Sequence, residues 1–530
     1  MPEPTSGRGA RSPALHLTID PASDLPLYRQ VYDGLREAIL AGRLPPGARL
    51  PATRELAKDL AVSRNTVLVA FEQLRSEGYL VGRRGGGTHV RAGIPDVLLR
   101  VPKRRESRRI EQAAAGTRVP TGVSAPGKPA GKLSARGTNL VERATSLVEF
   151  AGLAPVPFQL GLPATDAFPA RVWSRLGARR WRLGNMNLGH ADPAGEVELR
   201  QALASYVTTA RGAHCTPDNV LVVNGAQQAL HLIAQVLLDP GDSVWIEDPG
   251  YGGAQAAFVA AGARIVPVRV DNEGLDVGAG EEAAGAARLA YVTPSHQYPL
   301  GSVMSAARRL RLLAWARRAG AYIIEDDYDS EFRFAGRPLP CLQGLDTDQS
   351  ASGHASCVLY VGTLSKTLVP GLRLGYMVVP DHLVDALRAA RAALDRHTST
   401  TDQAVLADFI GLGHYARHVR RVRNLCAERQ AALVTAIAST LGELLSVNTD
   451  AAGLHVVGRL PGNMDDRAAS RAAAAEGVRA AALSTHRIAP PSPSPEPGGL
   501  LLGYGGFDER RIRWGVDRLH RALTRMHQPS

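Results

Sequence analysis

The spacing of apolar residues divides the chain into three zones. Over residues 22–91, apolar side chains recur every three or four positions, as at Val31, Leu35 and Ile39, which predicts amphipathic helices. Residues 92–155 are rich in Pro, Gly, Ala, Ser and Arg, which indicates a flexible basic linker. Over residues 156–527, short apolar runs alternate with longer amphipathic stretches, which predicts βαβ units around a mainly parallel sheet.

The expected elements of the third zone follow from these runs. Strands are predicted at 219–223, 243–248, 264–268, 288–293, 321–326 and 357–362, and helices among others at 226–238 and 306–320.

The first zone predicts three helices followed by a strand pair. The helices are expected at 27–42, 53–61 and 64–78, with Thr53 and Ser63 as N-terminal caps of the last two. Residues 79–90 predict a two-stranded wing with a glycine tip. Two compact helices with a short connector are typical of a helix-turn-helix, whose second helix places its N-terminal residues in the DNA major groove.

The segment ARLPATRELAKDLAVSRNTVLVAFEQLRSEGYLVGRRGGGTHV resembles the winged helix-turn-helix of GntR-type bacterial transcription regulators. The resemblance implies a homodimer that binds a double-stranded DNA operator with repeated half-sites. It also implies DNA contacts from the second helix, the recognition helix and the wing, namely from Arg54, Ser63, Arg64, Asn65, Thr66, Arg84 and Gly85.

Composition narrows the class of protein further. The net charge of +12 favours contact with a polyanion. The first residues lack the apolar core of a signal peptide, and no apolar run reaches the ~18 residues of a membrane span. The four cysteines have no paired spacing, which argues against disulfides and against a metal site. We therefore expect a cytoplasmic, nucleoid-associated protein with neither a membrane segment nor a metal.

Lys366 is the one lysine after Lys132, in a chain that otherwise uses arginine for positive charge. A neutral lysine amine attacks a carbonyl, whereas guanidinium does not. Thr363, Ser365 and Arg373 flank it in YVGTLSKTLVPGLRLGY. Hydroxyls and a guanidinium bind phosphate, so this segment suits a phosphorylated aldehyde cofactor.

Three further segments fit the same cofactor. In IIEDDYDSEF, Asp326 and Tyr328 share one strand face and suit a pyridine nitrogen and a phenolic oxygen, although Glu325 and Asp327 compete because the register is open. In VVNGAQQAL, Gly225 opens a helix whose N–H groups bind phosphate. In EDPGYGG, Tyr251 is placed to stack on a ring or to pack on the core.

Together these segments, over residues 156–527, resemble fold-type I aminotransferases, which bind pyridoxal 5'-phosphate in an α/β fold with a mixed, mainly parallel sheet. The resemblance implies an imine to Lys366 and ring stacking by Tyr251. It implies Asp326 and Tyr328 at the pyridine nitrogen and phenolic oxygen. Phosphate contacts are implied from Gly225, Ala226, Thr363, Ser365 and Arg373.

The chain departs from the aminotransferase pattern at two places. TPSHQYPLG stands where an asparagine is usual near the phenolic oxygen, so that His296, Gln297 or no residue takes its place. In GGLLLGYGG, Leu501 stands where the arginine for the substrate carboxylate is usual, which puts ordinary amino-acid transamination in doubt.

A GntR-type head, a linker and an aminotransferase-like region together resemble the MocR family of regulators. The resemblance implies that pyridoxal phosphate, or its adduct with an amine, modulates operator binding. Two effectors stay open: pyridoxal phosphate itself, in control of vitamin B6 supply, or an amino acid or amine. The alternative function is a working aminotransferase that carries a DNA-binding module.

Overall fold

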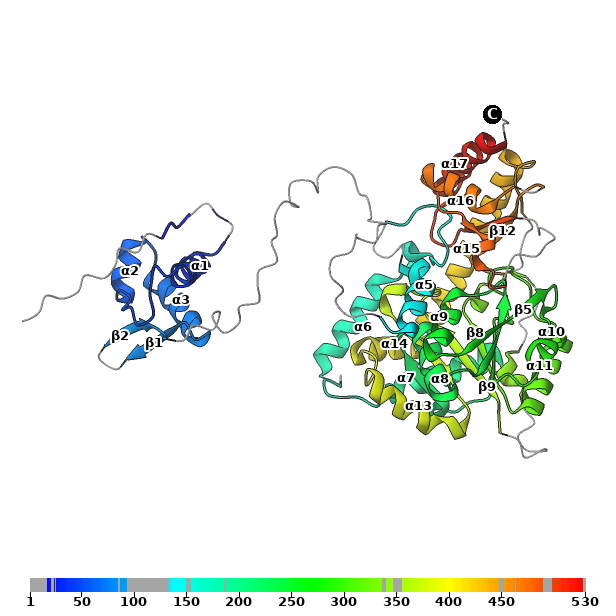
Figure 1. Cartoon of the computed structure of the whole chain (residues 1–530), viewed down its shortest axis with the longest axis horizontal. Helices are drawn as coiled ribbons and strands as arrows, with labels where there is room; N and C mark the ends of the chain where they lie inside the picture. The colour runs from blue at the N-terminus through cyan, green and yellow to red at the C-terminus, as the bar shows by residue number, and fades with distance from the viewer. Residues whose placement is uncertain are drawn as a thin grey trace, which may run out of the picture. The chain divides into compact units, whose positions relative to one another are not determined.

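The computed structural model describes the chain in two compact units, within residues 1–128 and 129–530 (Figure 1). The described residues are 17–20, 23, 25–83, 86–92, 133–148, 154–184, 187–335, 340–346, 355–447, 452–462, 464–489 and 498–527.

The first unit is a winged helix-turn-helix. Its elements are α1 (Leu27–Leu40), α2 (Thr53–Asp59), α3 (Arg64–Ser76) and the antiparallel strands β1 (Leu80–Arg83) and β2 (Gly87–Val90). The apolar stripe of α1 packs against that of α3, with Val31, Leu35, Val67 and Phe71 buried in one core. The predicted three helices and wing are confirmed.

The two predicted helix caps have different outcomes. Ser63 Oγ accepts a hydrogen bond from the backbone N–H of Thr66 at 3.0 Å, so Ser63 caps α3 as predicted. The prediction for Thr53 is wrong, because α2 already begins at Thr53 and the preceding Ala52 supplies no side-chain cap.

The second unit contains an eight-stranded sheet in the order β3-β10-β9-β8-β7-β4-β5-β6. Strands β5, β4, β7, β8 and β9 pair in parallel, whereas β10 is antiparallel to both neighbours. The mixed, mainly parallel sheet is therefore confirmed. The strands are β3 (Val220–Val223), β4 (Ser243–Asp248), β5 (Arg264–Asp271), β6 (Gly274–Leu275), β7 (Leu289–Val292), β8 (Tyr322–Asp327), β9 (Val358–Thr363) and β10 (Gly375–Val378).

A smaller antiparallel sheet, ordered β11-β12-β14-β13, follows in the same unit. Its strands are β11 (Ser446–Val447), β12 (His455–Arg459), β13 (Ala481–Ala482) and β14 (Gly499–Gly503). The α-helices of the second unit are α5 (Ala135–Val148), α6 (Ala170–Leu183), α7 (Val197–Arg211), α8 (Ala226–Leu237), α9 (Gly252–Ala261), α10 (Val277–Ala284), α11 (Ala306–Ala319), α12 (Leu342–Leu345), α13 (Asp381–Leu394), α14 (Thr400–Gly411), α15 (His414–Thr440), α16 (Asp466–Ala475) and α17 (Glu509–His527). Short 3-10 turns are η1 (Thr165–Ala167), η2 (Pro217–Asn219), η3 (Ser330–Phe332), η4 (Pro370–Leu372) and η5 (Leu483–His486).

Helices cover both faces of the large sheet, and successive strand residues alternate between the two cores. In β8, Ile324 packs with α8 and α9, whereas Ile323 packs with α11 on the opposite face. Because the alternation has a period of two, Asp326 continues the face of Ile324 and Asp327 that of Ile323. This register decides which carboxylate faces the candidate site.

The predicted flexible linker is corrected in its last third. Residues 135–148 form α5, and the Arg136 guanidinium donates to the backbone carbonyl of Ala260 in α9. The segment ARGTNLVERATSLV holds one glycine and no proline, so nothing in it opposes a helix, although the average composition of 92–155 concealed this. Residues 93–132 and 149–153 lie outside the described part of the chain.

Candidate functional site

Lys366 lies between β9 and η4 and is partly buried. Its Nζ donates to the backbone carbonyl of Gly161 at 2.9 Å. Burial lowers the pKa of the Lys366 ammonium below its ordinary value; Asp329 and Asp326 oppose this shift, and Arg373 adds to it. A lowered pKa increases the fraction of neutral amine, which is the form that attacks a carbonyl.

The strand register separates Asp326 from its two competitors. The Glu325 carboxylate accepts from the backbone N–H groups of Leu342 and Gln343 at 2.8 and 3.0 Å. Asp327 pairs with the buried guanidinium of Arg211 at 2.6 Å. Both carboxylates are therefore engaged in structural contacts on the sheet face of Ile323. Asp326, on the face of Ile324, is the carboxylate available to the candidate site.

Asp326 has one free carboxylate oxygen within the described structure. Oδ2 accepts from the Tyr291 hydroxyl at 2.8 Å, whereas Oδ1 is buried without a hydrogen-bond partner among the described residues. A buried acceptor without a donor is costly. A protonated ring nitrogen would supply that donor, so Asp326 fits the pyridine end of the cofactor.

Replacement of Asp326 by asparagine is expected to remove a pH dependence of stability in the cofactor-free protein. Burial raises the pKa of the Asp326 carboxyl to about 7. The folded protein then keeps this proton between pH ~4 and ~7 while the unfolded chain releases it, so the unfolding free energy falls as pH rises through that window and levels off above it. Denaturant unfolding at several pH values measures this slope.

Asp385, an exposed aspartate on α13, supplies the matched control for this experiment. Asp385→Asn should keep the wild-type slope. An Asp326→Asn protein with the same slope as wild type would contradict the assignment of the pH dependence to Asp326.

Tyr328 and His296 meet at the position predicted for the phenolic oxygen. His296 Nδ1 lies 3.0 Å from the Tyr328 hydroxyl and 2.9 Å from Asp329 Oδ2. Because a carboxylate only accepts hydrogen bonds, His296 Nδ1 carries a proton and donates a hydrogen bond to Asp329. Gln297, the other candidate, donates its amide to the carbonyls of Pro249 and Tyr298 and holds the loop instead. Of the two replacements, the structure brings His296 to Tyr328.

Three chain segments converge at the predicted phosphate end. Gly225, with φ +89°, precedes α8, and a Cβ there would lie 3.1 Å from an Arg373 guanidinium nitrogen. Gly375 on β10 packs equally closely on Gly225 and pairs with Thr363 on β9. The Thr363 hydroxyl accepts from the backbone N–H of Ser365 at 3.2 Å.

These groups form a donor set for a phosphate. Ala226 is the first residue of α8, so its N–H belongs to the unpaired helix N-terminus. Arg373 adds a guanidinium, which also donates to the carbonyl of Asn224 at 2.8 Å. A phosphorylated cofactor therefore fits both ends of this site, at Asp326 and at Gly225.

Tyr251 is the N-cap residue of α9 and lies close enough to both Asp326 and Arg373 for their charges to act on its phenol. Its hydroxyl donates to Gln227 Oε1 at 3.3 Å, and its ring meets that of Tyr298 edge-on with centroids 5.9 Å apart. Burial raises the pKa of Tyr251 to about 12, so the phenol stays protonated. Gln227, Tyr291 and Tyr298 were not predicted, because they come from α8, β7 and the loop after β7 and are brought to the site only by the tertiary fold.

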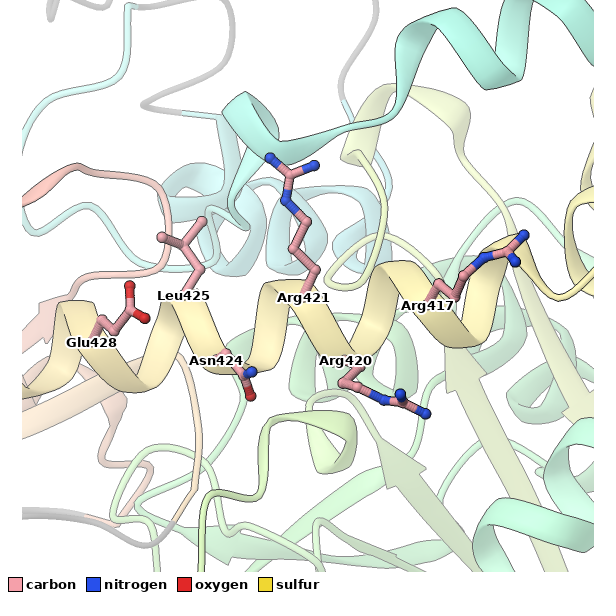
Figure 2. A pocket seen from close by; sticks show the side chains of 6 residues that line it. All are labelled: Arg417, Arg420, Arg421, Asn424, Leu425 and Glu428. Carbon is pink, nitrogen blue, oxygen red and sulfur yellow. The ribbon is translucent and has the colours of Figure 1, made fainter.

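A hollow of about 530 Å³ lies elsewhere, on the outer face of α15. Its lining residues are Arg417, Arg420, Arg421, Asn424, Leu425 and Glu428. On the buried face of the same helix, His418 contacts the carbonyl of Thr367, next to Lys366. Figure 2 shows Arg420 and Arg421 pointing away from each other, so their guanidinium groups do not converge on one ligand.

Four of the predicted DNA contacts, Ser63, Arg64, Asn65 and Thr66, lie at the N-terminus of the recognition helix α3. Arg64 and Asn65 are exposed, as is Arg54 on α2, and within the described structure their side chains make no hydrogen bond or ion pair. Ser63 and Thr66 are joined by the capping contact and a hydroxyl–hydroxyl bond of 2.8 Å. Arg84 and Gly85 lie outside the described residues.

Across the described helices, none is long and apolar enough to cross a membrane.

Comparison with known proteins identifies a matching family for each of the two units. Residues 27–90 match the model of bacterial regulatory proteins of the gntR family, and residues 172–493 match that of aminotransferase class I and II. The chain is 39% identical over 508 residues to the probable rhizopine catabolism regulatory protein MocR of Rhizobium meliloti, with 96% of each chain covered.

Two further likenesses bear on the cofactor. The HTH-type pyridoxine biosynthesis transcriptional regulator PdxR of Corynebacterium glutamicum is 28% identical, over 96% of this chain and 99% of that protein. The solved structure of LysN, an α-aminoadipate aminotransferase from Thermus thermophilus complexed with N-(5'-phosphopyridoxyl)-L-leucine, superposes with a TM-score of 0.65 at 29% identity, covering 74% of this chain and 97% of that one.

Proposed function

Because the chain belongs to the MocR family of transcription regulators, with a GntR-type winged helix-turn-helix and an aminotransferase class I and II domain, we propose that it is a homodimeric regulator whose operator affinity depends on pyridoxal phosphate. As an operator-binding protein it would work at the nucleoid in the cytoplasm. The residues 22–91 would be the DNA-binding domain and 156–527 the effector domain.

The binding of pyridoxal phosphate, as part of this proposal, is supported above all by the proximity of Lys366 and Asp326. The Asp326 carboxylate is close enough to Lys366 to act on the pKa of the lysine, and Asp326 Oδ1 is buried without a donor among the described residues. Pyridoxal phosphate supplies an aldehyde that condenses with primary amines and a ring that withdraws electrons. Lys366 would hold the aldehyde carbon and Asp326 the ring nitrogen.

The remaining site residues would divide the rest of the cofactor between them. Tyr328 would contact the phenolic oxygen, oriented by His296, and Tyr251 would cover the ring. The phosphate would be held by Gly225, Ala226, Thr363, Ser365 and Arg373.

A titration of operator affinity against pyridoxal phosphate tests the regulator function. A ligand changes a two-state equilibrium only if it binds the two states with different affinity, so a true effector must shift the apparent Kd for operator DNA. We expect a saturable shift with pyridoxal phosphate, alone or with an amine. No shift under any combination would contradict the proposal.

Replacement of Arg64 by alanine is expected to weaken operator binding by roughly 1–3 kcal/mol if the side chain reads a base edge. Arg64 is the first residue of the recognition helix and is exposed. Gel-shift titrations on operator and random DNA measure the effect. Equal losses on both DNAs would reassign Arg64 to a phosphate contact, while Arg513→Ala on α17 should leave binding unchanged.

A working aminotransferase is the alternative function. The cofactor end of the site favours it, because Lys366, Asp326, Tyr328 and Arg373 are all present. Leu501 opposes it, since it leaves no cation at the usual position for a substrate carboxylate. Sustained keto-acid formation from amino-acid donors at ordinary enzymic rates would establish the alternative; a single turnover or none would leave the regulator.

A further inference from the structure

Leu501 and His455 belong to one wall, formed by the smaller sheet. Leu501 pairs with Val457 in the neighbouring strand, two residues from His455, so their side chains share a face. Leu500 and Leu502 point to the other face, into the core beneath α15, α16 and α17. Leu501 is fully buried although it belongs to the face away from that core.

This wall faces the Lys366 site. Gly503, at the end of β14, pairs with Phe158, three residues before the Gly161 carbonyl that accepts from Lys366. The His455 ring lies 5.6 Å from that of Tyr298, measured between centroids. Tyr298 in turn meets the ring of Tyr328 at 5.9 Å. The wall therefore borders the space beside Lys366 and Tyr328.

The hydrogen-bond pattern of His455 leaves an acceptor on this wall. His455 Nε2 lies 2.9 Å from the carbonyl of Pro299, which accepts, so Nε2 carries the proton. Burial lowers the pKa of His455 to about 3, with further lowering by His296, so the ring is neutral near pH 7. Its Nδ1 is then an acceptor.

Tyr298 also keeps only acceptor capacity. His486 Nδ1 lies 3.3 Å from the carbonyl of Ala482 and 3.2 Å from Thr485 Oγ1, whose own proton goes to that carbonyl. His486 Nδ1 therefore donates, and its Nε2 accepts the Tyr298 hydroxyl proton at 3.0 Å. The Tyr298 oxygen can accept one more bond but has no proton left to donate.

We propose that the space beside Lys366 takes an amine whose far end is uncharged and hydroxylated, in preference to an amino acid. A carboxylate only accepts hydrogen bonds, so against Leu501, His455 Nδ1 and Tyr298 Oη it would be buried without donor or cation. A hydroxyl group donates to either acceptor. The requirement for an amino group rests on the proposed function, because the amine would bind to pyridoxal phosphate held at Lys366.

The test compares two amines on the full-length, pyridoxal-phosphate-loaded protein. The probes are 2-aminopropane-1,3-diol and L-serine, which share a carbon skeleton and differ by a hydroxymethyl group in place of the carboxylate. Binding is followed by the change in the visible absorbance of the protein and by operator affinity. We expect the diol to bind at least about tenfold more tightly than L-serine, because L-serine would bury a carboxylate that has no hydrogen-bond donor.

Variants locate the preference in the wall. His455→Leu should weaken the diol several-fold and leave L-serine unchanged, and Leu501→Arg should raise the affinity for L-serine. His382→Leu, which alters an exposed histidine bonded to Tyr322, is the matched control and should keep the wild-type preference. If the arginine buried in Leu501→Arg prevents folding, the result of His455→Leu still decides the question.

The outcomes separate this inference from the proposed function. A loaded protein that binds L-serine as tightly as the diol, or responds to neither, would overturn the inference alone. Arg333 directly follows η3, and Arg487 directly follows η5, next to His486. An L-serine affinity lost in Arg333→Gln or Arg487→Gln would also overturn the inference, by showing that one of these arginines receives the carboxylate. A protein that holds no pyridoxal phosphate would overturn the proposed function first.

Discussion

Replacement of Lys366 by alanine is expected to abolish covalent attachment of pyridoxal phosphate, and with it the effect of the cofactor on operator affinity. Among the described residues, no other lysine lies in the second unit, so nothing there replaces the lost amine. The wild-type protein should show a visible absorbance band and a borohydride-fixed adduct by mass spectrometry. The variant should show neither.

Two further lysine variants make this result specific. Lys366→Arg keeps a positive charge without a nucleophile, and it should lose the band as completely as alanine does. Lys58→Arg, at an exposed position of α2, should retain the band. Because burial disfavours the charged amine, the cofactor-free Lys366→Ala protein should unfold at the same temperature as wild type or higher. A band that survives Lys366→Ala would refute the assignment.

Replacement of Arg211 by alanine is expected to destabilise the second unit by about 3–5 kcal/mol. The Arg211 guanidinium donates twice to Asp327 Oδ2, at 2.6 and 2.7 Å, and the two side chains are only 7% and 2% exposed. Removal of the arginine leaves a buried carboxylate to which the Tyr360 hydroxyl still donates. Denaturant unfolding measures the loss.

A double variant distinguishes a lost ion pair from a simple cavity. Arg211→Met with Asp327→Leu removes both charges, and it should recover much of the stability lost by Arg211→Ala. If the double variant is as unstable as the single one, the loss comes from packing. The single variant should also weaken cofactor binding, because Asp327 without its partner raises the pKa of Asp326 further.

The winged helix-turn-helix could be predicted from the sequence because its signals are local. A helix of about 15 residues is specified by its own apolar spacing and caps, and the short connector fixes the next helix beside it. The same holds for β3, β4, β5, β7, β8 and β9 of the large sheet, whose apolar runs matched the observed bounds within a few residues, whereas β6 and β10 were not predicted. Helix α5 was missed because a Pro- and Gly-rich average hid an uninterrupted helical segment inside it.

The candidate site divides in the same way. Lys366, Thr363, Ser365 and Arg373 could be proposed as one group from the sequence because they occupy one short segment, and because few other residue types have their chemistry. The choice among Glu325, Asp326 and Asp327 could not be made from the sequence. Adjacent carboxylates in a strand point to opposite faces, and the sequence does not fix the register to within one residue.

By itself, then, the sequence determined the two-part architecture and placed an amine, two hydroxyls and a guanidinium in one segment around Lys366, because these depend on residue type and local spacing. The tertiary structure alone decided that Asp327 pairs with Arg211, that the Gly161 carbonyl accepts from Lys366, and that the rings of His455 and Tyr298 lie side by side. These contacts join residues more than 100 positions apart along the chain, and their geometry exists only after the sheets have packed.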